Sequence, residues 1–310
     1  MKRIVLLIAL VAAWVASVTA QTSLLATLSH NGQITTYFGS KALQEAYNAA
    51  ADGDVITLSP GQFESTEITK NITVRGAGMS GNNATVISGV VTLKPSDTEG
   101  SKTIEGLMIN SNLNDNGTSN TTILKCNIVS YITTYSGTQN FKVIHCEIGG
   151  TNGSVNGSYI GCHFSNGSFY KGILENCILE GDRTLSFSST LVKNSIINTT
   201  STNGFNSSNV FQGCVYIGSN TNPFKNVPAC ESNLVMPAGT EFLKEGTTTY
   251  ELRDELQTAW IGTDGRQIGM HGGTLPFDPR TTNPQIKKFD VSAKTSADGK
   301  LSVDIEIDAD

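Results

Sequence analysis

The chain has 310 residues and a formal net charge of −6 at neutral pH, and Asp, Glu, Lys and Arg make up only 15% of it. Ordinary domains carry about 25% charged residues, and nucleic-acid-binding surfaces need clustered Lys and Arg. Because the basic residues are scattered here, we expect no nucleic-acid partner and no polybasic membrane patch.

The first 20 residues are typical of a cleavable secretory signal. Lys2 and Arg3 precede an apolar run from Ile4, and the segment ends in small residues at Ala20. The apolar run is shorter than the ~20 residues that a membrane-spanning helix needs. We therefore expect cleavage after Ala20, no membrane span, and a mature chain that is secreted to the extracellular space or the cell surface.

The segment from Lys41 onward predicts an amphipathic helix followed by a strand. Leu43, Ala46, Tyr47 and Ala50 recur at helical spacing, and the strand-like run VITL begins at residue 55. A repeat structure must cover its first coil, because an unpaired end exposes core and sheet edge. We expect this helix to lie over that end.

Seven strand-like phrases repeat between residues 104 and 216, and each has a small or apolar residue in its fourth position. The phrases are IEGLMI, ILKCNI, VIHCEI, YIGCHF, LENCIL, VKNSII and FQGCVY. The fourth-position residues are Leu107, Cys126, Cys146, Cys162, Cys177, Ser195 and Cys214. A repeat of this length, with loops rich in Asn, Gly and Ser, indicates a solenoid with one coil per repeat.

Strand alternation predicts that the fourth position faces the core, together with the apolar residue two positions later. Cysteine suits such an inward ladder because it is small and apolar. We expect the five phrase cysteines to be buried, reduced and stacked. The alternative is a disulfide framework, which the exported context permits. Cys230 lies outside the seven phrases, and if any bridge exists we expect it between Cys214 and Cys230.

The composition changes near Pro223, because six of the eight prolines lie from that residue onward. We expect an N-terminal segment at 21–33, the solenoid at 34–275 and an extended linker at 276–285. The tail at 286–310 alternates apolar and polar residues on both sides of Asp298-Gly299, which predicts a β-hairpin.

Three stretches carry a family resemblance: KALQEAYNAAADGDVITLSPGQF at 41–63, ITKNITVRGAG at 68–78 and WIGTDGRQIGMHGG at 260–273. They resemble the capping helix, an early coil and the closing coil of secreted bacterial proteins in the pectin-lyase-like superfamily. The resemblance implies an all-β fold, a right-handed parallel β-helix with roughly ten coils. The strong bias of parallel crossovers supports the same handedness.

The resemblance transfers no catalytic residue. Between residues 101 and 225 there is no Asp-Asp pair and no Asn-x-Asp motif, and the chain contains no Gly-His-Gly. Enzymes on this fold use such carboxylates to hold calcium or to act as acid and base. We expect no cofactor and no metal site.

Two groups of side chains are weak candidates for a functional site. Strand alternation places Lys125, His145, Glu147 and His163 on the outward side of neighbouring coils, where they suit proton transfer on a sugar or metal binding. The alternative is a solvated face with a cross-coil ion pair between Glu147 and His163. We expect an exposed, shallow patch. The second group is the aromatic residues in or near the turns, which either stack on sugars or fill corners of the core; they are Tyr131, Tyr135, Phe169 and Tyr170.

The sequence thus predicts an exported, cell-surface or extracellular β-helix protein without catalytic activity, acting as a scaffold or as a glycan-binding or adhesive element. The alternative is a polysaccharide lyase or glycoside hydrolase that works on the outer sheet face. The partner in both cases is a polysaccharide or a cell-surface glycan.

Overall fold

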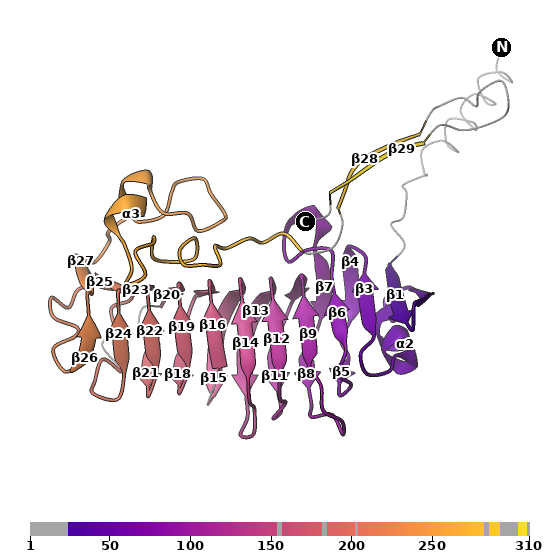
Figure 1. The fold of residues 1–310 in the computed structure, drawn as a ribbon, viewed down its shortest axis with the longest axis horizontal. Helices are drawn as coiled ribbons and strands as arrows, with labels where there is room; N and C mark the ends of the chain where they lie inside the picture. The colour runs from indigo at the N-terminus through magenta and orange to yellow at the C-terminus, as the bar shows by residue number, and fades with distance from the viewer. Residues whose placement is uncertain are drawn as a thin grey trace, which may run out of the picture.

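The computed structural model describes residues 24–153, 157–181, 185–201 and 204–281, together with the backbone of 285–291 and 303–308. Parallel strands stack into a β-solenoid of about nine turns, close to the roughly ten that the repeats predict. Figure 1 shows the coils side by side along one long axis. The signal segment that we predict lies outside the described residues.

Two long sheets run the length of the solenoid, and each coil contributes one strand to each sheet. The parallel strands of the first sheet are β3 (Val55–Leu58), β6 (Thr73–Arg75), β9 (Lys102–Glu105), β12 (Thr121–Leu124), β14 (Phe141–Ile144), β16 (Gly157–Ile160), β19 (Ile173–Glu175), β22 (Leu191–Lys193), β24 (Val210–Gln212) and β26 (Ala229–Glu231). Those of the second are β4 (Gly61–Glu64), β7 (Thr85–Ser88), β10 (Leu107–Ile109), β13 (Asn127–Thr134), β15 (Glu147–Gly153), β17 (His163–Phe164), β20 (Ile178–Glu180), β23 (Ile196–Asn198), β25 (Val215–Gly218) and β27 (Leu234–Pro237).

A third face completes each coil between residues 67 and 188. The second half of β13 bends away from the second sheet and pairs with β11 and β15. The other strands of this face are short; they are β5 (Glu67–Ile68), β8 (Val91–Leu93), β11 (Leu113–Asp115), β18 (Ser168–Tyr170) and β21 (Ser186–Ser188). Apolar side chains from all three faces fill the interior in one continuous core.

The N-terminal end of the solenoid is capped, as predicted. The helix α2 (Ala42–Ala49) buries Leu43, Ala46 and Tyr47 and contacts the strands around the first coil. The structure adds an antiparallel hairpin, β1 (Leu25–His30) with β2 (Gln33–Phe38), and β1 pairs antiparallel with β3. Residues that we assign to the N-terminal segment and to the start of the solenoid at Ile34 thus form this hairpin.

The cysteine ladder is confirmed: the five phrase cysteines are free and 0% exposed. Burial raises the pKa of Cys214 to about 12 and raises those of Cys126, Cys146 and Cys162. The residue two positions later is also core in every phrase from Ile128 to Tyr216. The ladder holds thiols, and no disulfide joins Cys214 to Cys230, which is free and exposed.

The backbone around the ladder differs from the continuous strand that we predict. The ladder residue sits at a corner between the first and second sheets, and the residue before it adopts a left-handed conformation, as at Lys125 (φ 51°) and His145 (φ 54°). Each of the five ladder cysteines donates its Sγ–H to the carbonyl two residues earlier; for Cys126 the acceptor is the Leu124 oxygen at 3.3 Å. The corner, and not strand alternation, turns the preceding side chain outward.

The repeat also continues one coil further than the phrases suggest. Cys230 stacks on Phe211, so it occupies the first position of an eighth phrase. Asn233 occupies the ladder position, and its Oδ1 accepts a 2.8 Å hydrogen bond from the Cys214 amide. The sequence prediction that Cys230 lies outside the repeat was therefore wrong, because an asparagine replaces the ladder cysteine there.

The chain then turns back along the outside of the solenoid. Residues 238–281, which we call the strap, contain one short helix, α3 (Asp254–Ala259), and run from β27 back over the second sheet (Figure 1). The stretch 260–273 belongs to this strap. The prediction that it forms the closing coil was therefore wrong. Beyond the strap, β28 (Gln285–Val291) and β29 (Val303–Asp308) pair antiparallel and confirm the tail hairpin.

Candidate functional site

The strap packs on the outer face of the second sheet through a second apolar cluster. Ile178, Ile196 and Val215 point outward from three successive coils and are at most 1% exposed. Strap side chains such as Trp260 and Met270 cover them. Burying such side chains contributes about 1.5–3 kcal/mol each, so this contact is strong enough to hold the strap in place.

Glycines in the strap allow it to approach the corner row closely. A Cβ on Gly262 would lie 2.5 Å from Asn194 Cγ, and one on Gly273 would overlap the Asn176 side chain. The Thr263 amide donates to Asn194 Oδ1 at 2.9 Å. The glycine-rich WIGTDGRQIGMHGG stretch is thus explained by backbone contact with the asparagine corners.

The strap also covers the two histidines proposed as outward candidates. His145 is 6% exposed; its Nε2–H donates to the Leu275 carbonyl at 3.1 Å, and its ring packs edge-on against Phe277. The buried Nδ1 has no hydrogen-bond partner in the structure. Burial lowers the pKa of His145, because a protonated ring would leave a buried N–H unpaired.

The His163 side chain contacts two residues, Tyr250 through its ring face and Glu180 through a ring nitrogen. It is 8% exposed, it stacks on the Tyr250 ring with centroids 4.4 Å apart, and its Nε2 lies 2.9 Å from Glu180 Oε2. The hydrogen bond from His163 lowers the pKa of Glu180, and Asn198 Nδ2 donates to the other carboxylate oxygen. The sequence prediction paired His163 with Glu147, and the register does place them side by side, but Glu180 is the hydrogen-bond partner.

Lys125 and Glu147 complete the predicted group. Lys125 Nζ lies 3.9 Å from Asp278 Oδ2 of the strap, and Glu147 Oε2 accepts from Asn127 Nδ2 at 3.2 Å. Desolvation raises the pKa of Glu147. The four candidates do lie on neighbouring coils, but the expected exposed and shallow patch was wrong, because the strap covers both histidines.

A cavity of about 590 Å³ lies between the strap and the β6–β7 loop. Glu147 lines it together with Met79, Tyr250 and Phe277, and three threonines of the strap complete the wall. Burial and the two carboxylates Glu147 and Glu180 raise the pKa of the Tyr250 hydroxyl. Of the four predicted candidates, only Glu147 faces this cavity.

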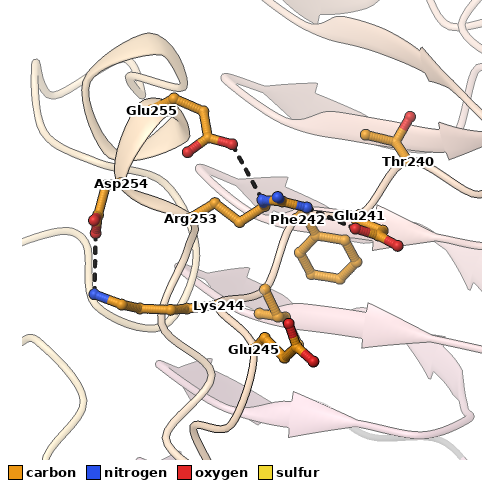
Figure 2. A pocket seen from close by; sticks show the side chains of 9 residues that line it. Thr240, Glu241, Phe242, Lys244, Glu245, Arg253, Asp254 and Glu255 are labelled. Carbon is orange, nitrogen blue, oxygen red and sulfur yellow. Dashed lines mark hydrogen bonds and ion pairs between the residues drawn. The ribbon is translucent and has the colours of Figure 1, made fainter.

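A second cavity, of about 700 Å³, lies within the strap beside α3 (Figure 2). Arg253 pairs with Glu241 and Glu255, and Lys244 pairs with Asp254 at 3.1 Å. These pairs are largely exposed, where each contributes about 0–1 kcal/mol. They connect two parts of the strap and leave no basic side chain of the cavity unpaired for an anionic ligand.

The aromatic candidates divide into core and surface. Phe169 is 2% exposed and stacks on Phe187 inside the solenoid, so it is a core residue. Tyr131, Tyr135 and Tyr170 are 38%, 52% and 39% exposed. Of the two alternatives that the sequence left open, the core position therefore applies to Phe169 and the exposed position to the three tyrosines.

The Tyr131 ring lies flat along the outer surface of the third face. A Cβ on Gly150, one coil on, would come within 2.7 Å of the ring, so only glycine leaves room for it. Asn166 Nδ2 donates to the Tyr131 hydroxyl at 3.3 Å and holds its far end. One side of the ring thus rests on backbone, and the rest of its exposed area is on the solvent side.

The outer face around Tyr131 carries no charge among the residues that the structure describes. Alternation points one set of side chains of β11, β13, β15, β18 and β21 outward, and all of them are uncharged; they are Asn114, Tyr131, Thr133, Gly150, Asn152, Ser168, Tyr170, Ser186 and Ser188. We call this set the tyrosine face. Lys171 lies at its rim, with Nζ 5.2 Å from the Tyr170 ring centre.

Within the described ranges there is no cluster of three or more His, Cys, Asp or Glu residues able to hold a metal ion. No helix in this part of the chain is long and apolar enough to cross a bilayer. Comparison of the chain with protein-family models, with curated proteins and with solved structures finds no match in any of the three.

Proposed function

We propose that this protein is an exported β-helix of the pectin-lyase-like type that binds an uncharged polysaccharide on its tyrosine face and does not cleave it. The observation that carries the proposal is the tyrosine face, whose described outward side chains are uncharged and where Tyr131 and Tyr170 are exposed among hydroxyl and amide groups. Aromatic rings stack on the apolar faces of sugars, while Ser, Thr and Asn exchange hydrogen bonds with sugar hydroxyls.

The spacing of the two rings favours an extended ligand. Tyr131 and Tyr170 stand two coils apart, which corresponds to roughly 10 Å along the axis at about 4.8 Å per coil. A polymer lying along the solenoid axis meets both rings, whereas a small molecule meets only one. A shallow surface of this kind gives each sugar a weak contact, and the repeated contacts along one chain add up.

The test is binding of the mature chain to an array of neutral and uronic-acid polysaccharides, followed by calorimetry with the strongest neutral ligand. We expect Tyr131→Ala and Tyr170→Ala each to weaken binding about three- to tenfold, because an aromatic contact contributes about 0.5–1.5 kcal/mol. Gly150→Ala, which displaces the Tyr131 ring, has the same effect.

The matched control is Phe38→Ala, an aromatic residue 65% exposed on β2 at the other end of the molecule. This variant keeps the affinity of the unchanged protein. Absence of binding to every polysaccharide, or equal loss in Phe38→Ala, contradicts the proposal.

A hydrolase or lyase is the second candidate, and the cavity beside Glu147 is the observation that favours it. Glu147 has a raised pKa and Glu180 a lowered one, and both carboxylates act on Tyr250. Opposite shifts in neighbouring carboxyls are a feature of acid and base pairs. Release of reducing or unsaturated ends from a polysaccharide panel, abolished by Glu147→Gln, would establish this activity in place of simple binding.

A further inference from the structure

Lys102, the first residue of β9, is a lysine buried inside the solenoid. It is 1% exposed, and Ile104 on the same side of the strand is a core residue. Desolvation lowers the pKa of Lys102, although the carboxylates of Asp52 and Asp115 oppose that shift. Lysine is rarely buried, because removing an ammonium from water costs free energy that an apolar side chain at this position would avoid.

The Lys102 ammonium has hydrogen-bond donors to spare. Its Nζ donates to Asn71 Oδ1 at 3.0 Å, and among the residues that the structure describes this is its one acceptor. An ammonium carries three N–H groups. Two of them therefore remain for a ligand.

A cavity of about 550 Å³ lies over this lysine, within the usual size range of small-molecule sites. The buried residues Asn71 and Lys102 line its inner end. Its walls come from three loops, which are 95–100 after β8, 117–120 after β11 and 139–140 before β14. The cavity shares no residue with the tyrosine face, so it is a separate place on the molecule.

Hydrogen bonds to buried side chains fix the walls of the cavity. Asn71 Nδ2 donates to the Thr98 carbonyl at 3.0 Å and holds the first loop in place. The carboxylate of Asp115, which is 0% exposed, accepts from the Thr118 amide at 2.8 Å and from the Thr138 hydroxyl at 2.8 Å. A cavity shaped in advance loses less conformational entropy when a ligand binds.

The charges and polar groups of the lining determine the class of ligand. Asp97 and Glu99, which are exposed at the rim, disfavour an anion, and Lys102 at the inner end disfavours a cation. The other polar side chains are hydroxyls and amides, which both donate and accept hydrogen bonds; they are Asn71, Ser96, Thr98, Ser119, Asn120, Gln139 and Asn140. An uncharged ligand with hydroxyl groups around its whole edge matches this lining.

We propose that this cavity binds one neutral sugar residue, whose hydroxyl oxygens accept hydrogen bonds from Lys102 Nζ while its outer hydroxyls donate to Asp97 and Glu99. The residue is either a free monosaccharide or the terminal unit of a glycan, and both present the same ring of hydroxyls. The site is independent of the polysaccharide that we place on the tyrosine face.

The test is saturation-transfer NMR of the mature chain with glucose, galactose, mannose, fucose and N-acetylglucosamine, followed by calorimetry with the strongest binder. We expect Lys102→Met to weaken binding at least tenfold, because hydrogen bonds from an ammonium are lost. Methionine keeps the apolar stem without the buried charge, so the melting temperature should not fall. The matched control is Lys225→Met, an exposed lysine near the other end of the solenoid, which keeps the affinity.

Two further variants separate this site from a structural role of Lys102 and from the tyrosine face. Asp97→Asn changes an exposed side chain, leaves folding intact and weakens sugar binding about threefold or more. Tyr131→Ala leaves sugar binding unchanged. An oligosaccharide that ends in the same sugar distinguishes the sources: tighter binding assigns the site to a glycan terminus, and equal binding to a free sugar.

Several results would overturn the proposal. They are the absence of binding to every neutral sugar, tighter binding of a uronic acid or a free amino acid than of any neutral sugar, and an affinity that Lys102→Met leaves unchanged. If Lys102→Met does not fold and Asp97→Asn keeps the full affinity, the ammonium is a structural group and the cavity is not a sugar site.

Discussion

A left-handed residue stands directly before the ladder position in eight coils. Three of these residues are glycine and two are asparagine, which tolerate that conformation best; the set is Gly106, Lys125, His145, Gly161, Asn176, Asn194, Gly213 and Ser232. Runs such as NSI and GCV therefore carry a corner signal in the sequence. Strand alternation correctly predicted which side chains enter the core, but it missed the corner because it assumed one continuous strand.

Gly161 combines the left-handed conformation with a close neighbour, which makes it a sharp test of the corner. Its Cβ would lie 2.8 Å from His145 Cδ2, whereas a Cβ on Gly265, also left-handed, meets nothing within 4 Å. We expect Gly265→Ala to destabilise the protein by about 1 kcal/mol, from backbone strain alone, and Gly161→Ala by about 2–4 kcal/mol. Urea unfolding of the two variants measures the difference; equal values would show that His145 moves aside freely.

The strap was not predicted because its contacts link residues far apart in sequence. Leu275 meets His145 across 130 positions, and no periodicity reports such a pairing. The sequence did contain a partial sign of the strap, at the outward-facing position directly after the ladder residue. Glu147 and His163 occupy this position in two coils. In later coils the same position holds Ile178, Ile196 and Val215, and apolar residues on both sides of a strand indicate a cover on each side.

The strap's attachment is expected to weaken on acidification. The folded-state pKa of His145 is lowered, so its contribution to stability is complete above the unfolded-state value of about 6.5 and is lost as the pH falls below it. Melting temperatures between about pH 7.5 and pH 5.5 should fall for the unchanged protein. His145→Gln retains a donor for the Leu275 carbonyl without the titration, and should show a smaller fall. An identical fall in both would assign the effect to other groups.

The candidate site was only partly predictable. The sequence identified the aromatic residues near turns but left open which of them are exposed: Tyr131, Tyr135 and Tyr170 reach solvent, whereas Phe169, next to Tyr170, is buried. Tyr250 and Glu180, which hold His163, were missed: Tyr250 belongs to the strap, and Glu180 is one of several scattered acids. Local patterns show which face a side chain occupies, whereas the partner on that face depends on the path of a distant segment.

At the scale of the whole molecule, each coil contacts only its neighbours. A destabilising mutation at one end should therefore increase local unfolding near that end and not along the whole solenoid. Leu43 is 3% exposed and covers the first coil. We expect Leu43→Ala to destabilise the protein by about 2–5 kcal/mol and to increase hydrogen exchange in the strands before residue 90, with little change beyond residue 160. Ile34→Ala, on the exposed hairpin, serves as the control. Faster exchange throughout the solenoid would instead show that the molecule opens as one unit.

The strap also gives the solenoid a fixed length. It meets Asn194 through Thr263, His145 through Leu275 and Gly106 through Thr281, in an order opposite to that of the coils. An inserted or deleted coil between Cys146 and Ser195 would shift every later contact by about 4.8 Å and would separate the strap from its partners. Repeat proteins commonly gain and lose units during evolution. In this chain the strap contacts are compatible with only one number of coils.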